Sequence, residues 1–300
     1  MTSPVANTYR EYGVNYYPKL VSAIPFTPVT GPRLMLKPDI KPAQVLPLIC
    51  KKIAQHLNEF DMSSMHWLFV DKQLSDELLH SNQLCRHSVQ FQWFNRSYLD
   101  FEHYLSYFNS RKRKSIKKER SKIAADGVDI VRVFGDDLSE QSMQFFYRCY
   151  KETYNKRSGH DGYLTAEFFN QIYRTMRQNI MLVIAHKDDR MIASALYIYD
   201  DSQLCGRYWG TLEECNNLHF EVCYYQGIEF CIEQNIPQFN PGTQGEHKIL
   251  RGFEPIYCYS NHFLSKKAFH DGVGRFIEQE KSLLEKYKTD AEQLLPFKQQ

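Results

Sequence analysis

The sequence of 300 residues has almost no net charge, since 37 Lys and Arg stand against 35 Asp and Glu and leave +2 at neutral pH. A chain without a strong overall field is not drawn as a whole to nucleic acid or membranes, so such binding needs a local patch. The residues are 43% hydrophobic and 14% aromatic, which excludes intrinsic disorder and can supply the cores of two ordinary domains or one large domain.

The sequence also lacks the short motifs of several enzyme classes: it has no H-E-x-x-H, no C-x-x-C, no Walker loop and no G-x-S-x-G. Most of its eight cysteines lie inside apolar runs such as 48–50 and 230–232, which is typical of reduced, buried cysteine. The N-terminus has no signal pattern, and no apolar run approaches membrane-spanning length. We therefore predict a cytoplasmic protein without a transmembrane segment or a metal site.

Hydrophobic periodicity predicts a chain of mixed helices and strands. Helices are expected where apolar residues recur every three or four positions, at residues 39–60, 100–127, 139–155, 165–178, 217–234 and 267–295. Strands are expected at 65–70, 89–94, 128–134, 180–186, 191–199, 203–210, 237–240 and 257–264. The first half repeats the later part of this order without any repeat of residues, as if it lacked opening helices and a hairpin.

The segment 241–253 is the strongest candidate for a functional site, because three glycines frame an acid, an imidazole and two cations. Glycine permits tight turns and close approach of the backbone to a ligand. His247 is a proton carrier near neutral pH, and Lys248 and Arg251 would share one face of a helical turn, where they could bind phosphate or carboxylate. The alternative is a helix N-terminus capped by Glu246, with solvated cations.

The predicted helix 217–234 is apolar nearly all round, so we expect it to be buried. Its polar residues, including His219 and Glu221, would then need partners. A buried carboxylate at Glu221 would have a raised pKa and could act as a general base toward an amine. The alternative is an ion pair of Glu221 with a cation such as Arg207 or Arg251, which would only hold the fold.

Residues 111–122 contain eight Lys or Arg and one Glu. Such a run could form a basic helix face for tRNA, for a nucleotide-linked substrate or for an anionic membrane surface. A solvated helix face is the alternative.

Several longer strings are informative in combination. They are Tyr16-Tyr17-Pro18-Lys19-Leu20, the stretch 25–33, Arg113-Lys114-Ser115-Ile116-Lys117-Lys118-Glu119-Arg120, Tyr163-Leu164-Thr165, Gly206-Arg207-Tyr208-Trp209-Gly210, Leu218-His219-Phe220-Glu221-Val222-Cys223-Tyr224-Tyr225 and Gly245-Glu246-His247-Lys248. Together they resemble the bacterial predicted N-acyltransferases labelled as peptidoglycan biosynthesis or recognition proteins. That group is similar to the FemABX family, which carries two tandem GNAT-like domains.

The resemblance implies an α/β (α+β) fold of tandem GNAT-like domains, with mixed sheets flanked by helices. It implies an incomplete N-terminal repeat at residues 1–99 and a complete C-terminal domain with a C-terminal helix at residues 100–300. Members of the group normally carry a longer stretch before the segment 16–20. We therefore expect this chain to be a truncated or alternatively started form.

The same resemblance limits the donor to acyl-CoA or aminoacyl-tRNA, with no tightly bound cofactor. GNAT enzymes that use coenzyme A place a glycine-rich loop after the third core strand, where backbone amides meet the pyrophosphate. The equivalent segment 210–217 has no glycine pair and carries two acids, which would repel a pyrophosphate. FemABX proteins also lack that loop and use aminoacyl-tRNA.

The resemblance implies an N-acyltransferase that acts on a primary amine, either of a peptidoglycan-type precursor or of a small molecule. The residues expected to carry the proton are Glu221, His247 and His219. The residues expected to bind substrate are Arg207, Tyr208, Trp209, Glu246, Lys248, Arg251, Lys19 and Arg33. Ordinary strand packing is the alternative for 207–209. For the whole chain, the alternative is a non-catalytic protein that recognises cell-wall fragments or RNA.

Overall fold

The computed structural model describes residues 4–243 and 245–298. The chain forms two compact units, which we call unit 1 (Met1–Gln90 and Ile256–Ala291) and unit 2 (Phe91–Pro255 and Glu292–Gln300). This grouping differs from the predicted boundary at residue 100, because residues 256–291 pack with the N-terminal part of the chain. The interpretation of each unit as a GNAT-like repeat stays a prediction.

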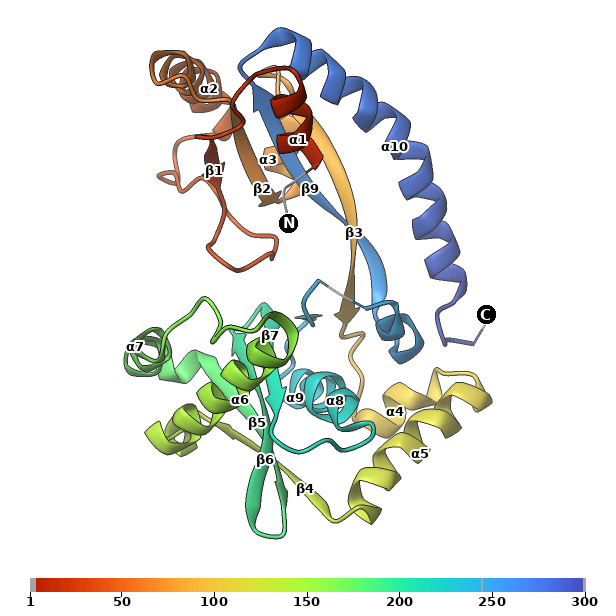
Figure 1. Cartoon of the computed structure of the whole chain (residues 1–300). Helices are drawn as coiled ribbons and strands as arrows, with labels where there is room; N and C mark the ends of the chain where they lie inside the picture. Colours follow the sequence, from red (N-terminus) through yellow and green to blue (C-terminus); the bar gives the residue numbers. More distant parts are fainter. Residues whose placement is uncertain (1–3, 244, 299–300) are drawn as a thin grey trace. The chain divides into compact units, whose positions relative to one another are not determined.

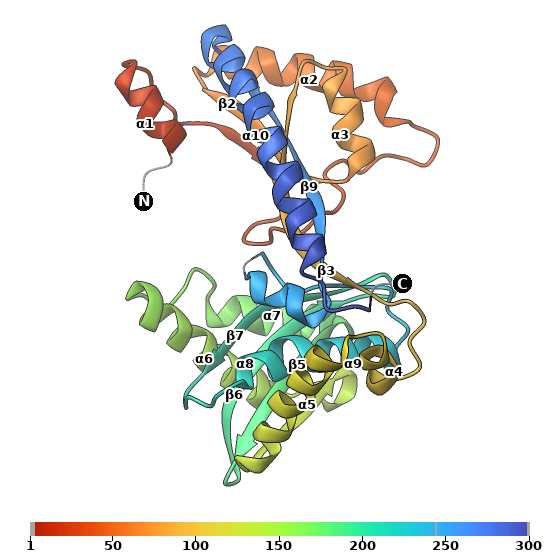
Figure 2. The same cartoon turned by 90° about the vertical axis from the view of Figure 1, so that its right-hand side faces the viewer.

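Unit 1 is a small mixed sheet with helices on both faces (Figures 1 and 2). Its strands follow the order β1 (Leu20–Ser22), β2 (Ser64–Val70), β9 (Glu254–Leu264) and β3 (Leu84–Phe94). On one face, α2 (Pro42–Glu59) and α3 (Lys72–Leu79) pack against Met65 and Trp67. On the other face, α1 (Pro4–Glu11) meets α10 (Lys267–Gln293), where the rings of Tyr9 and Phe269 stack with their centroids 3.9 Å apart.

Unit 2 contains the larger sheet, whose strand order continues β3-β8-β7-β6-β5-β4. The strands β4 (Val128–Phe134), β5 (Ile180–Lys187), β6 (Arg190–Tyr199) and β7 (Gln203–Thr211) are antiparallel, and β8 (Gln238–Asn240) is parallel to β7. Short 3-10 helices follow β4 (η1, Gly135–Asp137) and precede β5 (η2, Arg177–Asn179).

The helices α6 (Glu140–Ser158) and α7 (Ala166–Met176) cover one face of this sheet (Figure 2). The opposite face carries a continuous helical segment made of α8 (Leu218–Phe220), the π-helix η3 (Glu221–Tyr225) and α9 (Gln226–Glu233). The helices α4 (Phe101–Ser106) and α5 (Ser110–Ala125) lie beside that segment, and η4 (Glu246–Arg251) follows β8. The approach of α6 to β7 depends on Gly210, since a Cβ there would overlap the carbonyl oxygen of Cys149.

The hairpin strands β5, β6 and β7 and the helix after them confirm the predicted order. The single helix predicted over 100–127 is wrong, because the chain breaks it after Ser106 and restarts it with Asn109, whose side chain accepts the amide of Lys112 as an N-cap. The helices α1 and α3 were not predicted, although Asp71 caps α3 by accepting the amide of Leu74.

Candidate functional site

The strand β7 is only partly paired on the side of β8. It pairs with β6 from Leu204 to Thr211, but with β8 over Gln203–Cys205 alone. In the part of the chain that the structure describes, no strand pairs with residues 206–211 on that side. The register against β6 also shifts so that Arg207 is the extra residue of a bulge. One edge of β7 is therefore unpaired among the described residues at the place where the resemblance to GNAT proteins predicts binding of the acyl group.

The three predicted substrate-binding residues on β7 have different surroundings. Tyr208 packs into the core, with its ring 5.1 Å from that of Tyr150. Arg207 lies over the ring of Tyr208, with its guanidinium carbon 4.9 Å from the centroid. Trp209 meets the imidazole of His219 at 4.9 Å. Strand packing therefore explains Tyr208, whereas Trp209 adjoins a predicted catalytic residue.

Two imidazoles and a phenol gather beside this end of β7. The Nε2 atom of His247 is hydrogen-bonded to the hydroxyl of Tyr224 at 2.8 Å. The ring of His219 lies 5.2 Å from Tyr224 and 5.8 Å from His247. Burial, with the nearby cations, lowers the pKa of His219 to about 4 and also lowers the pKa of His247. Both imidazoles are therefore neutral at pH 7 and able to accept a proton.

The π-helix is the local feature that arranges the phenols. A π turn takes one residue more than an α turn, and such turns are frequent at functional sites. Here it covers Glu221–Tyr225 and buries both Tyr224 and Tyr225. Sequence periodicity gave no sign of this turn, since the apolar residues of the segment surround the whole helix.

Backbone conformation and close packing explain two glycines of the segment 241–253. Gly245 has φ +106°, and a Cβ there would overlap the imidazole of His247. Gly252 has φ +82°, and a Cβ there would overlap the hydroxyl of Tyr104. The helical turn predicted near Gly245 is confirmed as η4, which follows that glycine. Each glycine thus allows a functional or aromatic side chain to lie directly against the backbone.

Lys248 is a buried amine, only 1% exposed. Its Nζ donates to the carbonyl oxygen of Gly242 at 2.7 Å, and no carboxylate among the described residues forms an ion pair with it. Burial lowers its pKa to about 8. The amine therefore changes charge near pH 8, and it is not the solvated cation of the alternative interpretation.

Arg251 is also buried, and both terminal nitrogens of its guanidinium are hydrogen-bonded. Its Nη2 donates to Glu119 at 2.8 Å, its Nη1 donates to the carbonyl oxygen of His247 at 2.8 Å, and its guanidinium carbon lies 3.4 Å from the centroid of Phe220. Glu246 lies at the start of η4. The solvated-cation alternative is therefore wrong for Arg251 as well.

Glu221 forms a buried ion pair, as the structural alternative predicts. Its carboxylate accepts two bonds from Arg120, at 2.8 and 3.0 Å, and one from Gln226 at 2.8 Å. Arg120 also donates to Glu229 at 2.6 Å. The predicted partners, Arg207 and Arg251, were wrong, because the cation comes from the basic run in α5, about 100 residues earlier in the chain.

The basic run of α5 is divided between two faces. Ile116 and Ile123 are buried, and Glu119 and Arg120 on the same side bind residues of η3, α9 and η4. Lys117 pairs with Glu102 at 2.5 Å, and both side chains are largely exposed. Among the described residues, no ion pair holds the remaining cations of the run, which are Arg111, Lys112, Arg113, Lys114, Lys118 and Lys122.

The other two predicted substrate-binding residues lie in unit 1. The Nζ of Lys19 donates to the hydroxyl of Tyr16 at 2.9 Å and lies 4.4 Å from the centroid of that ring. Arg33 donates to the carbonyl oxygens of Leu68 and Val29 at 2.9 and 2.8 Å. Its guanidinium therefore fixes a backbone loop, whereas the ammonium of Lys19 is held by an aromatic side chain.

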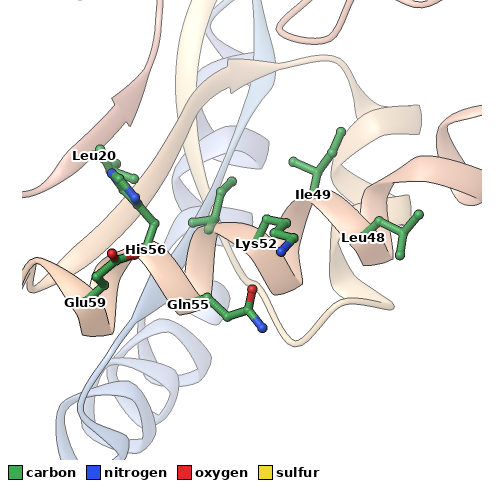
Figure 3. A pocket seen from close by; sticks show the side chains of 8 residues that line it. Leu20, Leu48, Ile49, Lys52, Gln55, His56 and Glu59 are labelled. Atoms are coloured by element: carbon green, nitrogen blue, oxygen red, sulfur yellow. The ribbon is translucent and has the colours of Figure 1, made fainter.

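Unit 1 also has a shallow groove along α2 (Figure 3). Apolar side chains line most of it, including Leu48 and Ile49, and the helix adds Lys52, His56 and Glu59. None of these residues was predicted to be functional. Within residues 4–243 and 245–298, no helix is long and apolar enough to cross a membrane.

Comparison with known proteins identifies the family of the chain and the solved structures that share its fold. The family model FemAB-like, described as peptidoglycan biosynthesis/recognition, matches residues 3–299. No curated protein is detectably similar in sequence.

Several solved structures are similar to the chain, among them the following three. They are L-PGS from Bacillus licheniformis (11% identity, TM-score 0.51, 78% of this chain and 79% of that one), the C-terminal domain of a predicted lysylphosphatidylglycerol synthetase from Agrobacterium fabrum (10%, 0.50, 78% and 77%) and FemX (10%, 0.51, 84% and 85%). At such identities the likeness concerns the fold, and the predicted fold class is confirmed.

Proposed function

The chain belongs to the FemAB-like family of peptidoglycan biosynthesis/recognition proteins, and we propose that it transfers an acyl or aminoacyl group to a primary amine. The observation that carries the proposal is the open end of β7 beside two neutral imidazoles. Among the described residues, no strand pairs with 206–211 on the β8 side, so backbone amides there could hold a carbonyl oxygen. His219 contacts Trp209 of this segment, and Tyr224, which is hydrogen-bonded to His247, contacts His219.

In the proposed reaction the amine nitrogen bonds to the carbonyl carbon of the donor, and the ester oxygen or thioester sulfur leaves with its electron pair. The amine must lose a proton as this bond forms. We assign that proton to Nε2 of His247, directly or through the hydroxyl of Tyr224. Glu221 is a poorer candidate, because Arg120 and Gln226 already occupy its carboxylate.

We propose aminoacyl-tRNA as the donor in preference to acyl-CoA, with no tightly bound cofactor. The segment 210–217 lacks the glycine pair that would hold a pyrophosphate. The six cations of α5 that no described carboxylate pairs form a surface suited to a polyanion. FemX shares the fold, and the family description favours an amine of a peptidoglycan-type precursor as acceptor. Such a donor would place the activity in a bacterial cytoplasm.

The experiment is transfer of radiolabelled acyl groups by the purified full chain, with pooled aminoacyl-tRNA and pooled acyl-CoA offered separately and amine acceptors in excess. Transfer from aminoacyl-tRNA that His247→Ala abolishes would support the proposal. Failure with both donor pools would contradict an enzyme. Binding of cell-wall fragments or RNA without any turnover would instead support a recognition protein.

The pH dependence tests the role of Lys248. If its ammonium binds an anionic part of a substrate, activity falls as the pH rises through about 8, where the amine loses its charge. If its neutral amine accepts a proton, activity rises over the same range. Lys248→Met should remove whichever limb is seen.

A further inference from the structure

Two adjacent residues on the inner side of α5 connect this helix to the proposed site. Arg120 holds the π-helix through Glu221, as described above. Glu119 reaches a different target: its Oε2 accepts from Nη2 of Arg251 at 2.8 Å and also from the hydroxyl of Tyr225. Neither partner is solvated, since Arg251 and Tyr225 are 5% and 1% exposed.

Arg251 connects Glu119 to the backbone of His247. Its second terminal nitrogen donates to the backbone oxygen of His247 at 2.8 Å, and its planar guanidinium lies on the ring of Phe220. The hydroxyl of Tyr104 donates to the backbone oxygen of Arg251 at 2.7 Å. The guanidinium therefore has one orientation, in which it links a carboxylate of α5 to the backbone that carries the imidazole.

We propose that Glu119 is a positioning residue for His247 and acts through Arg251. The idea rests on the proposed function only in taking His247 as the proton acceptor. The positioning itself concerns the geometry and charge around the imidazole, and it can be measured without any substrate.

The charge around His247 makes the proposal measurable. The groups that face this imidazole are His219 from α8, Tyr224 from η3, and Lys248 and Arg251 from η4 itself. The carboxylate of Glu119 neutralises Arg251, the cation bonded to the backbone of His247. Removing that carboxylate while keeping Arg251 leaves an uncompensated positive charge, which disfavours protonation of the imidazole.

The experiment follows the His247 resonances by NMR in full-length protein labelled at histidine, assigned by their loss in His247→Gln. We expect Glu119→Gln to weaken proton binding at His247 by at least about threefold, which corresponds to half a pKa unit. Arg251→Gln should shift the pKa in the opposite direction. Glu119→Asp should restore part of the change, because it keeps the charge but shortens the reach.

The matched control is Glu102→Gln, which removes the carboxylate of the exposed pair that α5 makes through Lys117. It should leave the His247 pKa unchanged. Thermal melts establish that each variant is folded, and if Glu119→Gln does not fold, Arg251→Gln and Glu119→Asp carry the test.

An unchanged His247 pKa in folded Glu119 and Arg251 variants would overturn the proposal. An opposite pair of shifts in a protein without transferase activity would leave the positioning intact and contradict the proposed function instead. With activity present, the acidic limb of kcat against pH should move with the NMR pKa.

Discussion

Each unit buries a hydrogen-bonded polar network, and the two networks differ in charge. Unit 2 buries a network of paired charges, in which Arg120 contacts Glu221 and Glu229, and Arg251 contacts Glu119. Unit 1 buries a network of neutral groups: Nδ1 of His66 and Nδ1 of His262 are 2.8 Å apart, and Nε2 of His66 lies 2.9 Å from the hydroxyl of Ser64.

This difference predicts different responses to change. A paired ion in a buried site tolerates a wide pH range but not the loss of its partner, because the remaining charge is then buried alone. A pair of neutral imidazoles can share only one proton along the bond between them, so it tolerates substitution by a neutral side chain better than it tolerates acid. The two networks can therefore be separated experimentally.

The largest expected effect is the loss of Arg120. Arg120→Met leaves Glu221 buried beside Gln226 without a cation, so the free energy of unfolding should fall by about 3–5 kcal/mol. Urea denaturation of the full chain measures this value. Lys117→Met, which removes the exposed pair of the same helix, should cost less than about 1 kcal/mol. Equal effects of the two variants would show that burial does not distinguish the pairs.

The next effect concerns activity. His247→Ala should lower kcat at least about 10²-fold if the imidazole accepts the proton of the amine, whereas substrate binding should change little. His80→Ala, at an exposed position in unit 1, serves as the control. A fall in binding alone, with kcat preserved, would place His247 in substrate recognition.

A smaller effect should appear when unit 1 is acidified. Burial lowers the pKa of His66 to about 4 and that of His262 to about 3, whereas unfolded histidine titrates near 6.5. The unfolded chain therefore binds more protons between these values, and the free energy of unfolding should fall as the pH drops from about 6.5 to 4. A matched His66→Gln variant should show a flatter pH dependence; an identical curve would contradict the assignment.

The smallest effect per residue is expected on the outer face of α5. Replacing Lys114, Lys118 and Lys122 by Gln should leave stability nearly unchanged. It should reduce the slope of log affinity for RNA against log salt by about 0.7 for each phosphate that the variant no longer neutralises. Filter binding over a salt series measures the slope. An unchanged slope would separate α5 from RNA binding and leave it a solvated helix face.

What could be predicted from the sequence was local. The β5–β6–β7 hairpins follow from alternating apolar residues and short turns, and the glycines around His247 already indicated tight backbone. The π turn could not be predicted. Its extra residue would show as a shift in the spacing of apolar residues, and a helix that is apolar on all sides has no such spacing. The partner of Glu221 could not be predicted either, since Arg120 looks like one more cation in a basic run.

The path of the chain limits how this protein can be divided. The chain passes from unit 1 to unit 2 within β3, returns within β9 and enters unit 2 again at the end of α10. Its last segment packs Phe297 against Phe108, with ring centroids 5.2 Å apart, and the carbonyl oxygen of Pro296 accepts the amide of Asn109, the cap of α5. A deletion after residue 255 thus removes the support of the helix that carries Glu119. Neither unit corresponds to one uninterrupted stretch of the gene.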